Sequence, residues 1–461
     1  MSTIITTSIA SLAGLAATVP AIADKPPALP DQVMAEISPE SAKGFVDRLV
    51  SFGTRHTLSD TESDTRGIGA ARRWIKSEFE RFAEQSGRSG DEAIRVRFDP
   101  HHVQSGRRIS HPVDIVNVVF EIPGSMPEAR NRLYYVIGHY DSRNSTSGDF
   151  EHDAPGADDD GSGVAVTMEL ARVLSMHRFD STIILMPTAG EEQGLYGATG
   201  HAEAARRDGL DIRALLSNDI VGDPSGPLDA SGKPRTDRQH IRVFSEGVPA
   251  RVPGESDYAF IRRLSAESDS PSRQIARFID EIARLHDTPV KPMLVFRPDR
   301  FLRGGDHTPF NREGYAAVRF CEVFENYDHQ HQDVRVENGI QIGDLPEFVD
   351  AGYLADVARL NAAAIVHLAN APSTPANARI ITARLANDTT LRWDPVPEPD
   401  LGGYEVVWRE TTSPIWQHAR DVGNVTEATI DLSKDNWFFG VRSYDREGYR
   451  SPVAFPAAAM K

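Results

Sequence analysis

Residues 133–141 read LYYVIGHYD, a short apolar run that ends on a histidine and an aspartate. Residues 155–163 then read PGADDDGSG, a glycine-rich acidic turn, and the pattern from Val164 to Leu174 predicts an amphipathic helix. A strand, a polar turn and a helix in this order are typical of an α/β unit, in which ligands bind beyond the carboxyl ends of the strands. This stretch therefore predicts an α/β sheet with a polar site at one edge.

The same arrangement recurs further along the chain. The apolar run at 182–186 is followed by Glu191-Glu192, and Ala214-Leu215-Leu216 leads to Asp219. More strands are predicted at 113–120 and 316–320, and long helices at 67–82 and 350–368. Alternating strands and helices indicate a mostly parallel, mixed α/β sheet with helices on both faces.

Histidines and carboxylates gather where these strands end. Together they form a ligand set for zinc or a similar divalent ion. The groups concerned are His139 with Asp141, the triplet Asp158-Asp159-Asp160, Glu191-Glu192, Asp219, and the later stretch His329-Gln330-His331. Each group alone is more often structural, as a solvated loop or a helix cap. All of them in one domain indicate two metals that share a carboxylate, and a hydrolase that activates water.

Composition excludes several other classes of protein. The 461 residues carry a net charge of −17, which argues against nucleic acids and anionic membranes as partners. Cys321 is the one cysteine, so neither an intramolecular disulfide nor a cysteine-based metal site is available.

The first 23 residues carry no charge and resemble a secretory signal peptide, although the usual positive N-terminal region is missing. Ala21-Ile22-Ala23 fits the cleavage site, which predicts a secreted or periplasmic protein. No other stretch is long enough for a transmembrane helix, so we expect no integral membrane span. The prolines in residues 24–37 predict a linker.

Beyond the linker we expect a main domain at 38–370. Within it, residues 223–300 are polar and rich in Arg and Ser, and predict either an insertion near the mouth of the site or a passive surface excursion. Residues 371–376 read APSTPA, a second linker. Residues 377–461 show short β-runs that predict a small all-β sandwich. Its tryptophan and tyrosine pattern resembles a fibronectin type III module, for which we expect few contacts with the site and a role in surface or polymer contact.

The order of the motifs resembles the co-catalytic di-zinc exopeptidases, a group that contains bacterial leucyl aminopeptidases and aminopeptidase Y. The resemblance spans about residues 38–370 and is carried by residues 138–142, 155–163, 190–197, 218–219, 306–307 and His329. It implies that Glu191 is the general base and that the Asp159–Asp160 peptide is cis. It also implies one zinc on His139, Asp159 and Asp219, and a second on Asp159, Glu192 and His329.

Two residues near these ligands need separate comment. Asp141 is two residues from His139, so its carboxylate is expected to orient the imidazole. Members of the group commonly have a threonine two residues past the last histidine ligand, whereas this chain has His331 there. His331 therefore remains an alternative to His329.

The resemblance implies an aminopeptidase with two Zn²⁺ ions per chain, acting on peptide or protein N-termini, and residues 1–23 predict that it is exported. One alternative is a carboxypeptidase, which would need an arginine to anchor the substrate carboxylate; Arg297, Arg300, Arg303 and Arg319 are available, but the sequence does not place them. A glutaminyl cyclase is a second alternative, but the complete ligand set favours two metals. A non-catalytic binding protein is a third, and a missing ligand would be its signature.

Overall fold

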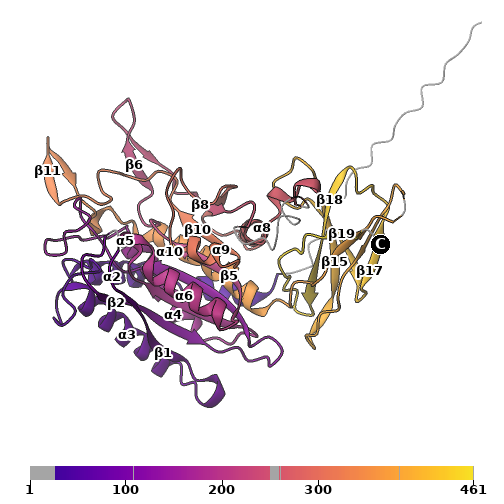
Figure 1. Cartoon of the computed structure of the whole chain (residues 1–461), viewed down its shortest axis with the longest axis horizontal. Coiled ribbons are helices and arrows are strands. Elements are labelled where there is room, and N and C mark those ends of the chain that lie inside the picture. The colour runs from indigo at the N-terminus through magenta and orange to yellow at the C-terminus, as the bar shows by residue number, and fades with distance from the viewer. Residues whose placement is uncertain (1–25, 107, 250–258, 260, 384, 460–461) are drawn as a thin grey trace, which may run out of the picture.

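The computed structural model describes residues 26–106, 108–249, 259, 261–383 and 385–459, and places a large α/β domain beside a small β-sandwich (Figure 1). The predicted signal peptide at 1–23 lies outside these residues. No helix in the described ranges is long and apolar enough to cross a membrane.

A mixed sheet of eight strands forms the centre of the large domain, in the order β1-β2-β4-β3-β5-β10-β8-β9. The four middle strands run parallel, and antiparallel pairs join β1 to β2, β2 to β4 and β10 to β8. This confirms the predicted fold class. The strands are β1 (Arg95–Val103), β2 (Val113–Ile122), β3 (Arg132–His139), β4 (Thr182–Thr188), β5 (Asp211–Asn218), β8 (His240–Ser245), β9 (Lys291–Val295) and β10 (Ala317–Cys321).

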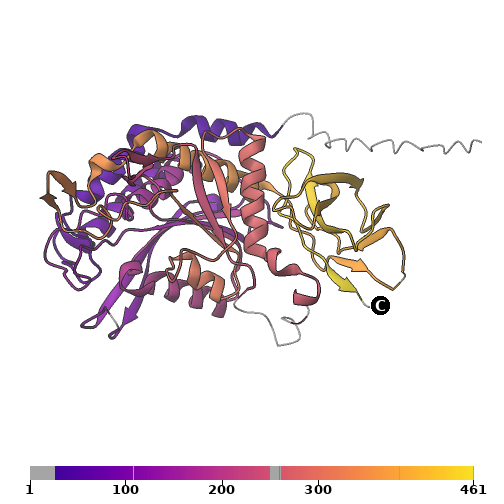
Figure 2. The same ribbon diagram turned by 90° about the horizontal axis from the view of Figure 1, so that it is seen from above.

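Helices cover both faces of this sheet (Figure 2). Alternate residues of β3 point to opposite sides: Tyr134 and Val136 join one apolar cluster, whereas Tyr135 and Ile137 join the other. The first cluster includes α2 (Pro39–Val50), α3 (Gly67–Gln85), α4 (Gly161–Leu174), α8 (Pro271–Leu285) and α10 (Ala351–Asn370). The second includes α6 (Tyr196–Arg207) and α9 (His307–Arg312). Because both faces are buried, the central strands are almost continuously apolar.

The predicted linker at 24–37 is wrong over most of its length. Residues Ala28–Glu36 form helix α1, which contacts α10 and buries Val33 and Met34. Pro30 lies in the first turn, where a backbone N–H has no partner within the helix, so the proline removes no helical hydrogen bond. Proline content alone therefore predicted a loop where tertiary contacts stabilise a helix.

The segment 223–300 is neither a simple insertion nor a passive excursion. It contains the hairpin β6 (Ser225–Leu228) and β7 (Pro234–Thr236), but it also supplies the sheet strands β8 and β9 and the helix α8. β8 (HIRVFS) mixes polar and apolar residues, and β9 (KPMLV) is only five residues long and begins with lysine and proline, so neither has the long apolar run of the central strands. A second small hairpin, β11 (Arg335–Glu337) and β12 (Ile340–Ile342), follows β10.

The C-terminal region is a sandwich of two small sheets, as the sequence predicted. One sheet has the order β17-β14-β13-β19 and the other β16-β15-β18. Trp393 and Tyr404 lie in the core between them, with ring centroids 5.4 Å apart. The strands are β13 (Arg379–Ile381), β14 (Thr389–Arg392), β15 (Leu401–Glu410), β16 (His418–Gly423), β17 (Glu427–Ile430), β18 (Trp437–Asp445) and β19 (Ala457–Ala459).

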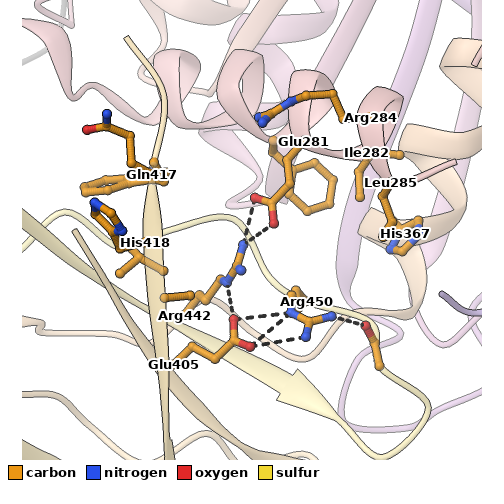
Figure 3. Close-up of a pocket in the computed structure, with 15 residues that line it drawn as sticks. Glu281, Ile282, Arg284, Leu285, His367, Glu405, Gln417, His418, Arg442 and Arg450 are labelled. Atoms are coloured by element: carbon orange, nitrogen blue, oxygen red, sulfur yellow. Dashed lines mark hydrogen bonds and ion pairs between the residues drawn. The ribbon is translucent and has the colours of Figure 1, made fainter. Parts of the chain in front are cut away.

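Charged side chains hold the sandwich against the α/β domain. Figure 3 shows Arg442 of β18 between Glu281 of α8, at 2.8 Å, and Glu405 of β15, at 2.7 Å. Arg409 of β15 lies 2.7 Å from Asp269, which precedes α8, and both side chains are almost fully buried. These ion pairs lie between the sandwich and the domain that carries the site, a docking that the linker at 371–376 did not predict.

Candidate metal centre and active site

The three neighbouring strands β4, β3 and β5 end beside one another. His139 is the last residue of β3, Asp219 directly follows β5, and Glu191 and Glu192 open the short helix α5 (Glu191–Gly194) just after β4. Because the strands are parallel, their carboxyl ends meet at one edge, and the sequence-predicted clusters converge there as expected.

Close backbone packing brings the acidic triplet to the same place. A Cβ on Gly138 would lie 2.4 Å from the backbone of Gly163, so only glycine allows the end of β3 to approach the start of α4 this closely. Asp160 caps α4 by accepting a hydrogen bond from the Gly163 amide at 2.8 Å. The peptide between Asp159 and Asp160 is cis, as the family resemblance implied.

Asp159 lies between two groups of potential ligands. Its Oδ1 is 3.2 Å from Nε2 of His139, and the same nitrogen is 3.9 Å from Oδ1 of Asp219. Its Oδ2 is 2.9 Å from Nε2 of His331, which in turn lies 2.9 Å from Oε1 of Glu192. The middle carboxylate of the triplet therefore lies between both groups, the position that the family resemblance implied for a bridging residue.

Asp160 is an alternative partner for the first group, since one of its oxygens also lies near His139 and Asp219. However, its carboxylate already accepts hydrogen bonds from the backbone amides of His139, at 2.9 Å, and Gly163, at 2.8 Å. These hydrogen bonds explain the position of the Asp160 carboxylate by its role as the cap of helix α4. Asp159 keeps its oxygens directed at the imidazoles and is the better ligand.

The predicted ligand His329 does not reach this cluster. Its Nδ1 lies 3.2 Å from Asp223, and its ring stacks on Phe348 with centroids 3.7 Å apart. His331 occupies the position instead. Its backbone has a φ of +55°, in the left-handed region, and this turn directs its ring toward Asp159 and Glu192. The geometry therefore favours His331, the alternative that the sequence left open, over His329, which the family resemblance implied.

His139 is held in a state suited to metal binding. Its Nδ1 lies 3.1 Å from the backbone oxygen of Asp141, so the ring can donate there and leave the Nε2 lone pair toward Asp159 and Asp219. Burial alone would lower the pKa of His139, but the carboxylates of Asp141, Asp159 and Asp219 raise it overall. This negative environment attracts a cation.

Asp141 also orients the start of α5. Its carboxylate accepts hydrogen bonds from the backbone amides of Glu191, at 3.3 Å, and Glu192, at 3.1 Å. It lies 3.6 Å from Nδ1 of His139. Asp141 is therefore a positioning residue, which acts through both neighbouring clusters rather than at a reacting atom.

Glu191 is half-buried and lines a cleft of about 620 Å³ beside the ligand cluster. Within the described ranges, no side chain or amide donates a hydrogen bond to its carboxylate. Burial raises the pKa of Glu191 well above its usual range, and repulsion from Asp219, Glu192 and Asp306 adds to this effect. A carboxyl group with a raised pKa and no fixed partner is suited to exchange protons with a substrate or water.

Three residues that the sequence analysis did not assign support the ligands. Asp344 accepts hydrogen bonds from the backbone amides of Asp158 and Asp159, both at 2.8 Å, and so fixes the triplet. Arg319 lies 3.0 Å from Asp219, and Arg143 lies 3.1 Å from Glu192. Burial would raise the pKa of Asp219, but Arg319 and His139 hold it below its usual value. Arg319 was a candidate from the sequence, but only the fold places it behind a ligand.

The donor set fits divalent zinc. Two imidazole nitrogens and three ligand carboxylates, those of Asp159, Glu192 and Asp219, provide the nitrogen and oxygen atoms that zinc prefers. Their proximity without a cation would be costly, because like charges in a buried site repel one another. His139, Asp159 and Asp219 would hold one ion, and Asp159, Glu192 and His331 the other.

Comparisons with known proteins give matches over most of this chain. Residues 117–341 match the model of peptidase family M28. A "Probable zinc metalloprotease" of Pyrenophora teres f. teres is 44% identical over 435 residues, which cover 93% of this chain and 87% of that protein. A second protein so named, from Leptosphaeria maculans, is 46% identical over 435 residues, 93% of this chain and 98% of its own.

Two solved structures share the fold. LapB from Legionella pneumophila has 19% identity and a TM-score of 0.50, with 74% of each chain covered. An aminopeptidase from Aneurinibacillus sp. strain AM-1 has 13% identity and a TM-score of 0.50, covering 74% of this chain and 96% of its own. At these identities the likeness concerns the fold alone.

Proposed function

The chain belongs to peptidase family M28, and from this premise we propose that it is a zinc-dependent aminopeptidase with two zinc ions. The observation that carries the proposal is the position of Asp159, with one oxygen toward His139 and the other toward His331. A carboxylate so placed serves two ions at once. The names of the curated relatives support zinc as the metal.

When bound, the zinc ions would supply an activated water and polarise the carbonyl of the scissile peptide bond. Glu191 takes one proton from the water while the oxygen of that water attacks the carbonyl carbon. The bond between carbon and nitrogen then breaks, and Glu191 returns the proton to the leaving amine.

Selection for a free amino terminus follows from the charge of the cleft. Glu191 and Asp219 both line it, so an ammonium group of the substrate finds acidic partners beside the reacting carbonyl. An N-acetyl group removes that positive charge and adds bulk at the same place. Both effects disfavour a blocked substrate.

We therefore expect N-acetylated aminoacyl-p-nitroanilides to be cleaved at least about 10²-fold more slowly than the free forms, equivalent to roughly 2.7 kcal/mol. The measurement is kcat/KM for each pair with the zinc-loaded enzyme. Equal rates for blocked and free substrates would exclude the aminopeptidase assignment and leave a zinc hydrolase of other specificity.

We further propose that the protein is exported and that its sandwich is a fibronectin type III module that contacts a surface or polymer. The uncharged residues 1–23 and the Ala21-Ile22-Ala23 site support export. N-terminal sequencing of protein from the medium or periplasm should then begin at Asp24. Retention of residues 1–23 in the mature protein would contradict this proposal.

A further inference from the structure

Arginines line the cleft beside the metal ligands. Arg300 and Arg303 lie on one wall, and Arg108 and Arg143 contact the opposite side of the ligand cluster. The chain as a whole has more acidic than basic residues, with a net charge of −17. Four guanidinium groups line the cleft together with the four carboxylates of Asp159, Glu191, Glu192 and Asp219, which are the candidate metal ligands and the proposed base.

Nearby carboxylates do not neutralise this wall completely. Glu325 is almost fully buried and contacts three guanidiniums: Arg242 at 2.7 Å, Arg300 at 2.5 Å and Arg303 at 3.1 Å. Burial would raise the pKa of Glu325, but Arg300, Arg242 and Arg319 lower it overall. Arg300 also pairs with Asp299, so two carboxylates face three guanidiniums, which leaves positive charge on this side of the cleft.

Arg303 is the member of this group that is open to a ligand. Its side chain is 34% exposed, whereas that of Arg300 is 9% exposed and is held by both Asp299 and Glu325. Within the described ranges, the 3.1 Å contact with Glu325 is the one ion pair of Arg303. Arg300 therefore supports the wall, and Arg303 presents its remaining N–H groups to the cleft.

The loop that carries Arg303 is fixed close to a metal ligand. Arg319 lies 3.0 Å from Asp299 at the start of the loop and 3.0 Å from Asp219. Gly305 abuts the same ligand, since a Cβ on it would lie 3.2 Å from Oδ2 of Asp219. Arg303 is two residues away, within about 7 Å along the backbone. Its guanidinium can thus reach a substrate whose scissile bond lies at the metals.

Arg108 supplies a second cation on the other side. Its Nη1 donates a hydrogen bond to the backbone oxygen of Glu192 at 2.5 Å. No carboxylate pairs with it in the part of the chain that the structure describes. Arg143, in contrast, is held by Glu192 and by Nδ1 of His331, so we do not count it as available to a substrate.

We propose that Arg303, with Arg300 behind it and Arg108 opposite, forms a carboxylate-binding subsite that selects substrates with an acidic group near the scissile bond. This inference rests on the proposed peptidase function and names its substrate class. The carboxylate can be an acidic side chain or the C-terminal α-carboxylate of a very short peptide. Guanidinium groups bind both kinds of carboxylate through charge-assisted, often bidentate, hydrogen bonds.

Three substrate pairs separate these sources, because each pair differs by one carboxylate against its amide. Glutamyl- and glutaminyl-p-nitroanilide test an acidic first residue. The amides of alanyl-glutamate and alanyl-glutamine test an acidic second residue. Alanyl-glutamine and its own amide test the α-carboxylate.

Affinity is measured by calorimetry on zinc-loaded Glu191→Gln protein, which is expected to bind these compounds without cleaving them. We expect the acid of at least one pair to bind about tenfold or more tightly than its amide, equivalent to about 1.4 kcal/mol. Raising the salt concentration should reduce this ratio, because the contact is partly exposed. Wild-type kcat/KM for the same pairs should follow the same preference.

Arg303→Gln and Arg108→Gln test the two walls, each in the Glu191→Gln background. Arg303→Gln should bring the acid-to-amide ratio close to one. The matched control is Arg297→Gln, because Arg297 belongs to the same segment but stacks on Phe301 and does not line the cleft. This control should leave the ratio unchanged.

The outcomes distinguish failure of the subsite proposal from failure of the proposed function. Equal affinity for acid and amide in all three pairs would overturn the subsite, as would equal loss of preference in the Arg303 and Arg297 variants. Acid preference in binding with no turnover by wild-type enzyme would support the subsite and refute the peptidase mechanism. Turnover by the wild-type enzyme without acid preference in binding would support the peptidase mechanism and refute the subsite.

Discussion

The Glu191→Ala enzyme is expected to lose about 10² to 10⁴-fold in kcat while it keeps its full zinc content. This is the usual scale for removal of a general acid–base residue. Glu191 lines the cleft, but it is not among the atoms that surround His139 or His331. Its removal should therefore abolish proton transfer without opening either metal site. The measurements are kcat on a free aminoacyl-p-nitroanilide and zinc per chain by elemental analysis.

Glu192→Ala is the matched control, because it removes the neighbouring carboxylate of the same helix. Glu192 lies 2.9 Å from His331 and belongs to the second group of ligands. Its loss should lower zinc content as well as activity. If both variants lost zinc equally, the division of roles between Glu191 and Glu192 would be wrong.

His331→Ala should reduce zinc from two ions per chain to one. Loss of a residue that only orients a ligand typically costs 10–100-fold in metal affinity, so loss of the ligand itself should cost more than about 100-fold. In the described ranges, His331 is the one imidazole that lies within 3 Å of both Asp159 and Glu192, whereas His139 contacts only the first of these. Zinc titration of the metal-free protein, followed by elemental analysis after dialysis, measures both stoichiometry and affinity.

His329→Ala provides the control for this variant. His329 is two residues away and stacks on Phe348, so its removal should leave two ions bound. Zinc loss in the His329 variant but not in the His331 variant would restore the assignment made from the family resemblance. One ion per chain in the active wild-type enzyme would refute the bridged pair of sites.

Local sequence patterns were sufficient for the central strands of the fold. β3 and β4 are continuous apolar runs, and α4 and α10 carry apolar residues at helical spacing, so each element is visible within a short window. β8 and β9 were missed because their register depends on strands distant in sequence. β8 pairs with β10, about 75 residues later in the chain, and β9 then pairs with β8.

The docking of the sandwich was missed for a related reason. A proline-containing linker indicates a boundary, but it carries no information about the surfaces on either side. Asp269 and Arg409 are separated by 140 residues and meet only in the folded chain. Their contact depends on two buried charges that match in position and sign, which no local pattern reports.

The sequence by itself determined the kind of chemistry. Histidine and carboxylates at the ends of successive parallel strands meet at one edge of the sheet, because strand direction fixes where each strand ends. The clusters that contain His139, Glu192 and Asp219 follow from that rule, whereas the choice of Asp159 and Glu192 within their clusters was implied by the family resemblance. Tertiary structure alone decided which later histidine joins them. Residues 329 and 331 lie in an irregular turn, where the direction of each side chain depends on local dihedral angles, and the left-handed backbone at His331 directs its imidazole toward the site.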